Sequence, residues 1–186
     1  MCGVGDPAED SHDGRLNALE PAHVDAFRAF QRPAEPADQS LSDQPAPAHG
    51  LGPELNRDLA RRVYEGPEGT IDLVPGPGAI CCVARNPQTG ERMAGTTSTE
   101  LAAHGTHGFI RSGPQRATTF VGVLSAAARD LQIITGSGQA ITVPVNADDA
   151  YWITVADPID MIVTKTDGTA RHIPFSRWRT QRPSRP

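Results

Sequence analysis

The sequence lacks the features that mark a membrane span, a secretory signal or a disulfide framework. No stretch approaches the roughly 20 consecutive apolar residues of a membrane span. The N-terminus, MCGVGDPAEDSHDG, has neither a basic nor an apolar segment and so does not resemble a secretory signal. Three cysteines are an odd number, which leaves at least one thiol unpaired within the chain. We expect a cytoplasmic protein as written, or an extracytoplasmic one if an N-terminal anchor has been lost.

Aromatic residues and sequence motifs of catalysis are also scarce. Aromatics make up 5% of the chain and apolar residues 38%. The sequence has no GxxxxGK[ST] phosphate loop, no GxGxxG before a helix, no GxSxG elbow, and neither HExxH nor CxxC. We therefore predict no cofactor and no metal. The net charge of −5 opposes non-specific binding of nucleic acid by the chain as a whole.

What is present divides the chain into four segments. Residues 1–22 are polar and acidic without periodicity, and we predict a disordered acidic arm. Residues 23–53 hold a short helix and then a Pro/Ala-rich linker, expected to be extended and solvated. Residues 54–175 are predicted to form a helix and a β-sandwich domain. Residues 176–186 are predicted to be a basic tail.

Two apolar stripes predict the helices. In the first, Val24, Phe27 and Phe30 recur at helical spacing. A helix of about ten residues is marginal by itself in water, so we expect this one to pack on the main domain. The second covers PELNRDLARRVYEG, residues 53–66, where apolar residues recur every four positions and Gly66 suits the C-cap.

From residue 70 the apolar period changes to two, which indicates strands. The run AICCVA is continuous, as is typical of a strand buried on both faces. GSG and TDGT each lie between two strand patterns and predict hairpins. Pro144 and Pro174 are expected at edges or strand ends, and residues 91–106 are expected to be irregular. The fold predicted is mainly β (α+β): an antiparallel sandwich of about 6–8 strands, preceded by two short helices.

The order of these patterns resembles a family of small uncharacterised proteins that is abundant in actinobacteria. The likeness runs from AFRAFQRP through TIDLVPGPGAICCVA to TDGTARHIPF and covers residues 23–175. It implies an N-terminal helix with a C-terminal β-domain, and no established activity. Members carry an anchor or signal and a cysteine pair, whose second member would fall near Thr96 and Thr97. Here both the anchor and that second cysteine are missing.

Cys81 and Cys82 are the first candidates for chemistry. A nucleophilic thiol needs a lowered pKa, usually from a histidine, a cation or a helix N-terminus. Adjacent residues on a strand point to opposite faces, so at most one of the two thiols faces a given site. Because both lie in an apolar run, we interpret them as core residues. Catalysis and a redox role are the alternatives.

His104 and His107, in AHGTHG, are the second candidates. Two imidazoles three residues apart can ligate zinc with further ligands, and Glu100 is near in sequence. Gly105 and Gly108 favour a turn, however, rather than a helix that presents both rings on one face. We interpret the histidines as loop residues, with catalysis beside Cys82 as the alternative.

Acidic residues and a basic–aromatic tail are the remaining candidates. Asp148 and Asp149, with Asp157 and Asp160 further on, lack the calcium-loop pattern, and the first two are interpreted as a turn before AYWITV. Tyr151 and Trp152 are noted with them, and Trp178 among Arg177 and Arg179 resembles a basic–aromatic tail suited to contact with a phosphate polymer or an acidic lipid surface. The alternative is that this tail neutralises the acidic first sixty residues.

Since no polar cluster converges in the sequence, the leading hypothesis is a non-catalytic interaction or structural β-module with a protein partner still unknown. We expect it not to be an enzyme. The alternative is a thiol- or metal-dependent enzyme that uses Cys81 or Cys82 with His104 or His107.

Overall fold

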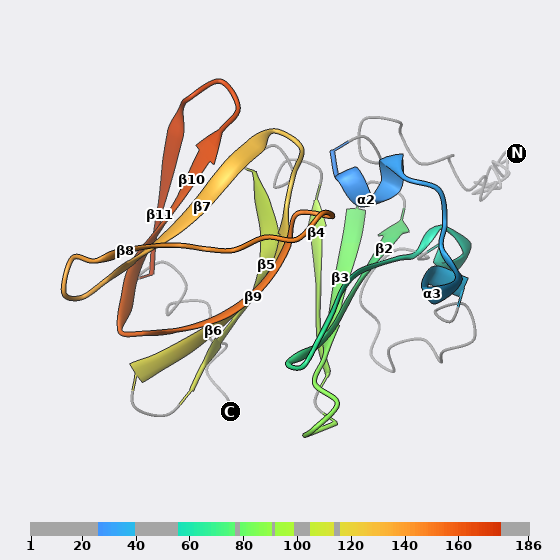
Figure 1. Ribbon diagram of the computed structural model, residues 1–186, viewed down its shortest axis with the longest axis horizontal. Helices are drawn as coiled ribbons and strands as arrows, with labels where there is room; N and C mark the ends of the chain where they lie inside the picture. Colours follow the sequence, from blue (N-terminus) through green and yellow to red (C-terminus); the bar gives the residue numbers. More distant parts are fainter. Residues whose placement is uncertain are drawn as a thin grey trace, which may run out of the picture.

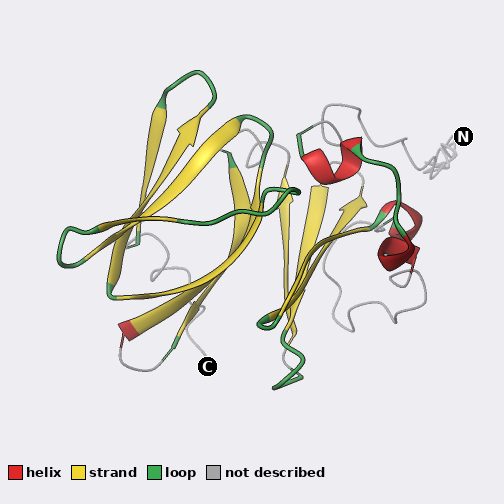
Figure 2. Cartoon of the chain, viewed as in Figure 1, coloured by secondary structure: helices red, strands yellow, loops and turns green. Residues whose placement is uncertain are grey.

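The computed structural model of the protein describes residues 26–39, 56–76, 79–90, 92–98, 105–113 and 116–175. In this part of the chain, eleven strands form three antiparallel sheets (Figure 1). The helices α2 (Arg28–Gln31) and α3 (Pro36–Gln39) are short and lie at one side of the strands (Figure 2). This confirms the prediction of a mainly β chain. None of the described helices is long and apolar enough to cross a membrane.

Sheet A has four strands in sequence order, each paired with the next. They are β1 (Arg61–Gly66), β2 (Gly69–Gly76), β3 (Ala79–Arg85) and β4 (Arg92–Ser98). All four residues from Cys81 to Ala84 are buried, as expected for a strand covered on both faces. Along β2, Ile71 and Leu73 lie in the core, while Asp72 between them points to the opposite face.

Sheets B and C contain the other seven strands. Sheet B has the order β5–β6–β9, with β5 (Thr106–Ser112), β6 (Ala117–Leu124) and β9 (Ala150–Ala156). Sheet C has the order β11–β10–β7–β8, with β7 (Ala128–Thr135), β8 (Ala140–Thr142), β10 (Pro158–Lys165) and β11 (Ala170–Pro174). The predicted GSG and TDGT hairpins are confirmed as β7–β8 and β10–β11.

Sheet B is the middle layer of the three (Figure 1). Val121 and Val123 of β6 pack with Ile71 and Leu73 of sheet A in one apolar cluster. Phe120 of β6 packs with the sheet C residues in a second cluster. Because neighbouring residues on a strand point to opposite faces, one strand supplies both cores.

Of the two predicted helices, the first is present only over Arg28–Gln31, with Phe27 extended just before it, and it packs on the sheets as expected. Helix α2 (Arg28–Gln31) is a single turn, and Phe27 and Ala29 are fully buried in the cluster between sheets A and B. Burying a phenylalanine contributes on the order of 2 kcal/mol, more than a lone helical turn supplies. The residues before Ala26 lie outside the described part.

The second predicted helix is wrong over most of its described length. Residues Arg57–Leu59 form one turn of 3-10 helix, and Arg61–Gly66 is strand β1. Val63 is buried in the core and β1 pairs with β2, so tertiary pairing outweighs the helical pattern. The sequence feature that points to this strand pair is the turn Gly66-Pro67-Glu68-Gly69, which joins β1 to β2.

Two further expectations need correction. The linker is not extended throughout, because helix α3 (Pro36–Gln39) lies within it and Asp38 is buried. Residues 91–106 are not irregular throughout, because β4 occupies 92–98. With β1 and β4 added, the strands exceed the six to eight expected. The predicted arm over residues 1–22 and tail over 176–186 lie outside the described residues.

Candidate functional site: a polar network that binds the N-terminal segment to the sheets

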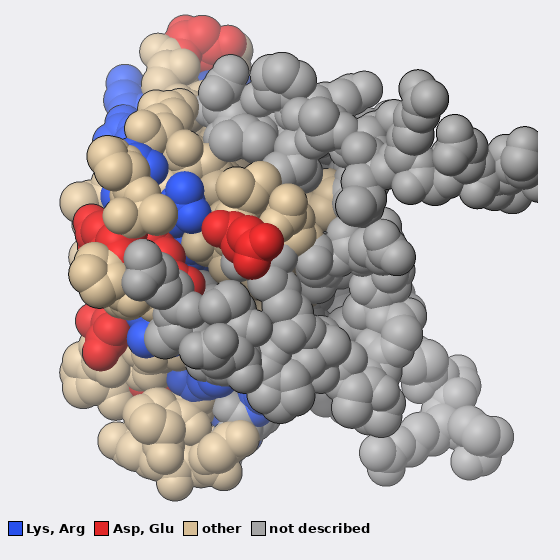
Figure 3. All heavy atoms as spheres, turned by 90° about the vertical axis from the view of Figure 1, so that its right-hand side faces the viewer, with Lys and Arg blue, Asp and Glu red and all other residues tan. Residues whose placement is uncertain are grey.

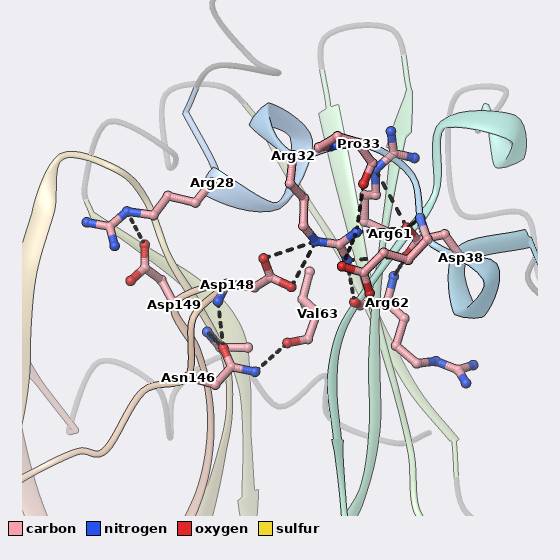
Figure 4. A network of polar contacts seen from close by, with 12 residues as sticks. Arg28, Arg32, Pro33, Asp38, Arg61, Arg62, Val63, Asn146, Asp148 and Asp149 are labelled. Atoms are coloured by element: carbon pink, nitrogen blue, oxygen red, sulfur yellow. Dashed lines mark hydrogen bonds and ion pairs between the residues drawn. The ribbon is translucent and has the colours of Figure 1, made fainter.

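Asp38, in α3, is the centre of a polar network beside strand β1 (Figure 4). One carboxylate oxygen accepts hydrogen bonds from Arg32 Nη1 at 2.9 Å and from the Glu35 backbone N–H at 2.7 Å. The other accepts from the Arg62 backbone N–H at 2.6 Å. The Asp38 side chain is 3% exposed, so these bonds replace nearly all of its hydration.

Arg32 connects Asp38 to strand β1 and to the turn before β9. Its Nη2 donates to the carbonyl of Arg62 in β1 at 2.9 Å. Its Nε donates to both carboxylate oxygens of Asp148, at 3.2 Å each. Asp148 lies in the turn that precedes β9, so a single guanidinium joins the N-terminal segment, sheet A and the entry to sheet B (Figure 4). A planar donor with five N–H groups suits such a branched contact.

The Asn146–Asp149 turn forms the third part of the network. The Asn146 side-chain oxygen accepts from the backbone N–H groups of Asp148 at 3.0 Å and Ala150 at 2.9 Å. Its amide donates to the carbonyl of Val63 in β1 at 2.7 Å. Asp149 has φ of 59°, a left-handed conformation that aspartate tolerates in turns. Its carboxylate is 3.1 Å from Arg28 Nε, in α2.

The network caps an edge strand. Strand β1 is the outermost strand of sheet A. Its Arg62 N–H, Arg62 carbonyl and Val63 carbonyl bond to the side chains of Asp38, Arg32 and Asn146. Unpaired backbone groups on an edge are a template for another strand. In this protein three side chains form hydrogen bonds with these backbone groups of β1, so the groups are not available to pair with another strand.

Charge and burial set the titration of the network. Burial would raise the pKa of Asp38, but hydrogen bonds from Arg32 and from the backbone of Glu35 and Arg62 outweigh it and lower that pKa. For Asp149, burial raises the pKa, and the charge of Arg28 offsets this only in part. Protonation in acid therefore lowers the stability of the fold at Asp38 and raises it at Asp149.

The structure places Cys81 and Cys82 as predicted, in the interior. Both are fully buried, and Cys82 lies in the cluster between sheets A and B. Burial raises the pKa of the Cys82 thiol far above its ordinary value, with smaller contributions from Cys81 and Asp72. A thiol in this state is a poor nucleophile.

His107 is not the loop residue that was predicted. It lies in strand β5 and is buried, with 8% exposure. It pairs in register with Val123, which belongs to the same cluster as Cys82. Since directly paired residues share a face, His107 and Cys82 face the same interlayer space. His104 and Glu100 lie outside the described residues.

The four predicted acidic candidates do not converge. Asp148 and Asp149 form a turn, as expected, although their contacts with Arg28 and Arg32 were not predicted. Asp157 Oδ1 is 3.8 Å from Arg116 Nη1. Asp160 Oδ2 lies 2.8 Å from His172 Nδ1, between the paired strands β10 and β11 of sheet C. Within the described ranges, no group of three or more His, Cys, Asp or Glu residues is arranged to hold a metal ion.

Tyr151 is an interior residue, and Trp152 is partly buried against the cluster between sheets A and B. The Tyr151 hydroxyl is 2.9 Å from Thr106 Oγ1, and burial raises the pKa of Tyr151 to about 12. Trp152 packs against Tyr64, with ring centroids 6.1 Å apart. Trp178 lies outside the described residues.

The residues that sequence reasoning missed are Arg28, Arg32, Asp38 and Asn146. Asn-Ala-Asp-Asp is a turn signal and points to the role of Asn146. Nothing local points to Arg32, whose partner Asp148 is 116 positions away. No protein-family model, curated protein or solved structure matches this chain.

Proposed function

We propose that this protein is a non-catalytic interaction or structural module. The observation that carries the proposal is the arrangement of the charged network. Arg32, Asp38 and Asp148 bond to one another and to the backbone of β1, and so hold the N-terminal segment on the sheets. Groups engaged in this way stabilise a scaffold and have little capacity left to bind and turn over a substrate.

The burial of Cys82 supports the same conclusion. Catalysis by a thiol requires a thiolate that a substrate can reach, whereas Cys82 is fully buried with a raised pKa. One observation favours the alternative of a thiol enzyme, namely that His107 and Cys82 face the same interlayer space.

Thiol labelling of the native protein separates the two functions. A Cys2→Ala variant leaves Cys81 and Cys82 as the only thiols. We expect slow reaction with a thiol reagent in the native state, at a rate set by unfolding, and full reaction of both thiols in denaturant. Rapid native labelling with a pH dependence that His107→Gln or His104→Gln abolishes would instead establish the thiol enzyme.

A further inference from the structure

The outer face of sheet A, opposite to sheet B, carries two rows of side chains that the strand register fixes. Ile71 and Leu73 point to the core between sheets A and B, so the residues that alternate with them point to the opposite face, which is buried at Asp72 and Val83 and exposed at Arg92. One row crosses the sheet as Arg62, Asp72, Val83. The neighbouring row crosses it as Glu65, Thr70, Arg85, Arg92.

Asp72 contacts two arginine side chains on this face of sheet A, Arg62 and Arg85. It is 1% exposed. Its Oδ1 accepts a hydrogen bond from Arg62 Nε at 3.1 Å, and its Oδ2 forms an ion pair with Arg85 Nη1 at 3.3 Å. Burial raises the pKa of Asp72, against the charges of Arg62, Arg85 and Arg92. A buried carboxylate thus fixes the positions of two guanidinium groups.

Arg85 and Arg92 lie directly opposite each other on β3 and β4. Like charges in this position destabilise a sheet. Burial lowers the pKa of Arg85; repulsion from Arg92 and Arg62 acts in the same direction, and Asp72 opposes it. Arg92 itself is exposed.

The charges on this face do not cancel within the described residues. Glu65 stands in the same row as Arg85 and Arg92, but two strand spacings, about 10 Å, from Arg85. Its carboxylate is 3.6 Å from Arg62. Three arginines therefore face two acids, and the unbalanced positive charge lies at the Arg85–Arg92 end.

The backbone beside this pair is held in a defined turn. Arg85 and Arg92 form the last rung of the β3–β4 pairing before the loop. In that loop, Asn86 Oδ1 accepts from the backbone N–H groups of Gln88 at 2.8 Å and Thr89 at 3.1 Å. Figure 3 shows basic and acidic side chains interspersed over the described part of the side on which α3 and sheet A lie.

We infer that Arg85 and Arg92 form a binding site for an oxyanion, a phosphate or carboxylate group, with Asp72 as the residue that positions Arg85. Guanidinium groups bind these anions through two parallel hydrogen bonds. A bound anion also cancels the repulsion between the two arginines. The site is independent of the proposed function, since the anion is supplied either by a partner's surface or by a small molecule.

Calorimetric titration with inorganic phosphate at pH 7 and constant ionic strength tests the site, and a parallel titration with succinate separates phosphate from carboxylate recognition. The test variant is Arg92→Gln. The matched control is Arg116→Gln, since Arg116 is also exposed, at 80%, and lies outside sheet A. We expect the intact chain and the control to bind at least one anion, and Arg92→Gln to bind it roughly tenfold more weakly. Binding of neither anion, or equal weakening in both variants, would overturn the inference.

A second measurement distinguishes this site from a structural role for Arg92. Without phosphate or succinate, Arg92→Gln removes a like-charge contact and should raise the melting temperature by roughly 1–3 °C. With the bound anion present, the intact chain should gain stability that the variant does not gain. A lower melting temperature of Arg92→Gln in the absence of anions contradicts the inference.

Discussion

Arg32 and Asp148 are 116 positions apart in the sequence, yet Arg32 Nε donates to both carboxylate oxygens of Asp148 at 3.2 Å. The two side chains are about equally exposed, at 20% and 19%. The same arginine also donates to Asp38 and to the carbonyl of Arg62. The contact therefore couples the N-terminal segment to the turn before sheet B through one side chain.

A double-mutant cycle measures this coupling. Arg32→Met keeps the alkyl chain but leaves Asp38 buried beside fewer donors, and should cost about 3 kcal/mol. Asp148→Asn should cost about 1 kcal/mol, and the double variant less than the sum by about 1 kcal/mol. Urea unfolding of the four proteins gives the free energies of unfolding.

Arg129→Met, which affects an exposed ion pair in sheet C, is the control for this cycle and should cost under about 0.5 kcal/mol. Strictly additive costs at Arg32 and Asp148 would rule out the coupling.

The docking of α2 is tested at Phe27. This side chain is fully buried between sheets A and B, so Phe27→Ala should destabilise the protein by about 3–5 kcal/mol. Thermal unfolding followed by circular dichroism provides the measurement. Phe30→Ala is the comparison, since Phe30 is only partly buried and should cost clearly less. Equal costs would mean that the segment does not depend on Phe27 for its attachment.

Acid stability should depend on Asp38. Its pKa is lower in the folded state than the ordinary value near 3.9, so its ionised form adds stability above about pH 4. That contribution is lost as the pH falls through the folded-state pKa. Asp38→Asn should be less stable than the intact chain at pH 7, and the gap should narrow as the pH falls from about 5 to about 2.

The difference between the two proteins is the quantity to follow in that experiment. Asp149 and Asp72 have raised pKa values and change stability with the opposite sign, so they mask Asp38 in the intact chain alone. They are present in both proteins and cancel in the difference. A gap that stays constant over the whole range would show that Asp38 does not titrate as the structure indicates.

Local sequence patterns predicted the strands that alternate cleanly and the turns that join them. The DG of TDGT marks the β10–β11 hairpin, where Gly168 has φ of 85°. The same reasoning failed at Val63, because Leu55, Leu59 and Val63 share a helical spacing that the pairing of β1 with β2 overrides. The apolar period within residues 53–66 carries no information about β2, with which β1 pairs after the turn at Gly66–Gly69. A helix was therefore predicted where pairing with β2 makes a strand.

The polar network was beyond sequence reasoning for a related reason. Asp38 lies in a segment rich in proline and alanine, which indicates a linker. Its burial depends on Arg32 on one side and on the Arg62 backbone on the other, and both contacts exist only in the assembled fold. The raised pKa of Cys82, by contrast, was foreseeable, because an apolar run predicts burial and burial disfavours the thiolate.

The cap on β1 leads to a prediction about self-association. In the double variant Arg32→Ala, Asp38→Ala, the Arg62 N–H and carbonyl lose their side-chain partners. An exposed edge pairs readily with a second edge, so this variant should form larger species at concentrations where the intact chain does not. Size-exclusion chromatography with light scattering over a concentration series measures the change, and circular dichroism verifies that the variant keeps its strands. The control is Arg129→Ala, Asp130→Ala, which removes an ion pair and hydrogen bond that join two side chains rather than a side chain and the backbone of an edge strand. If the folded variant keeps the mass of the intact chain at every concentration, the network stabilises the N-terminal segment without protecting the β1 edge.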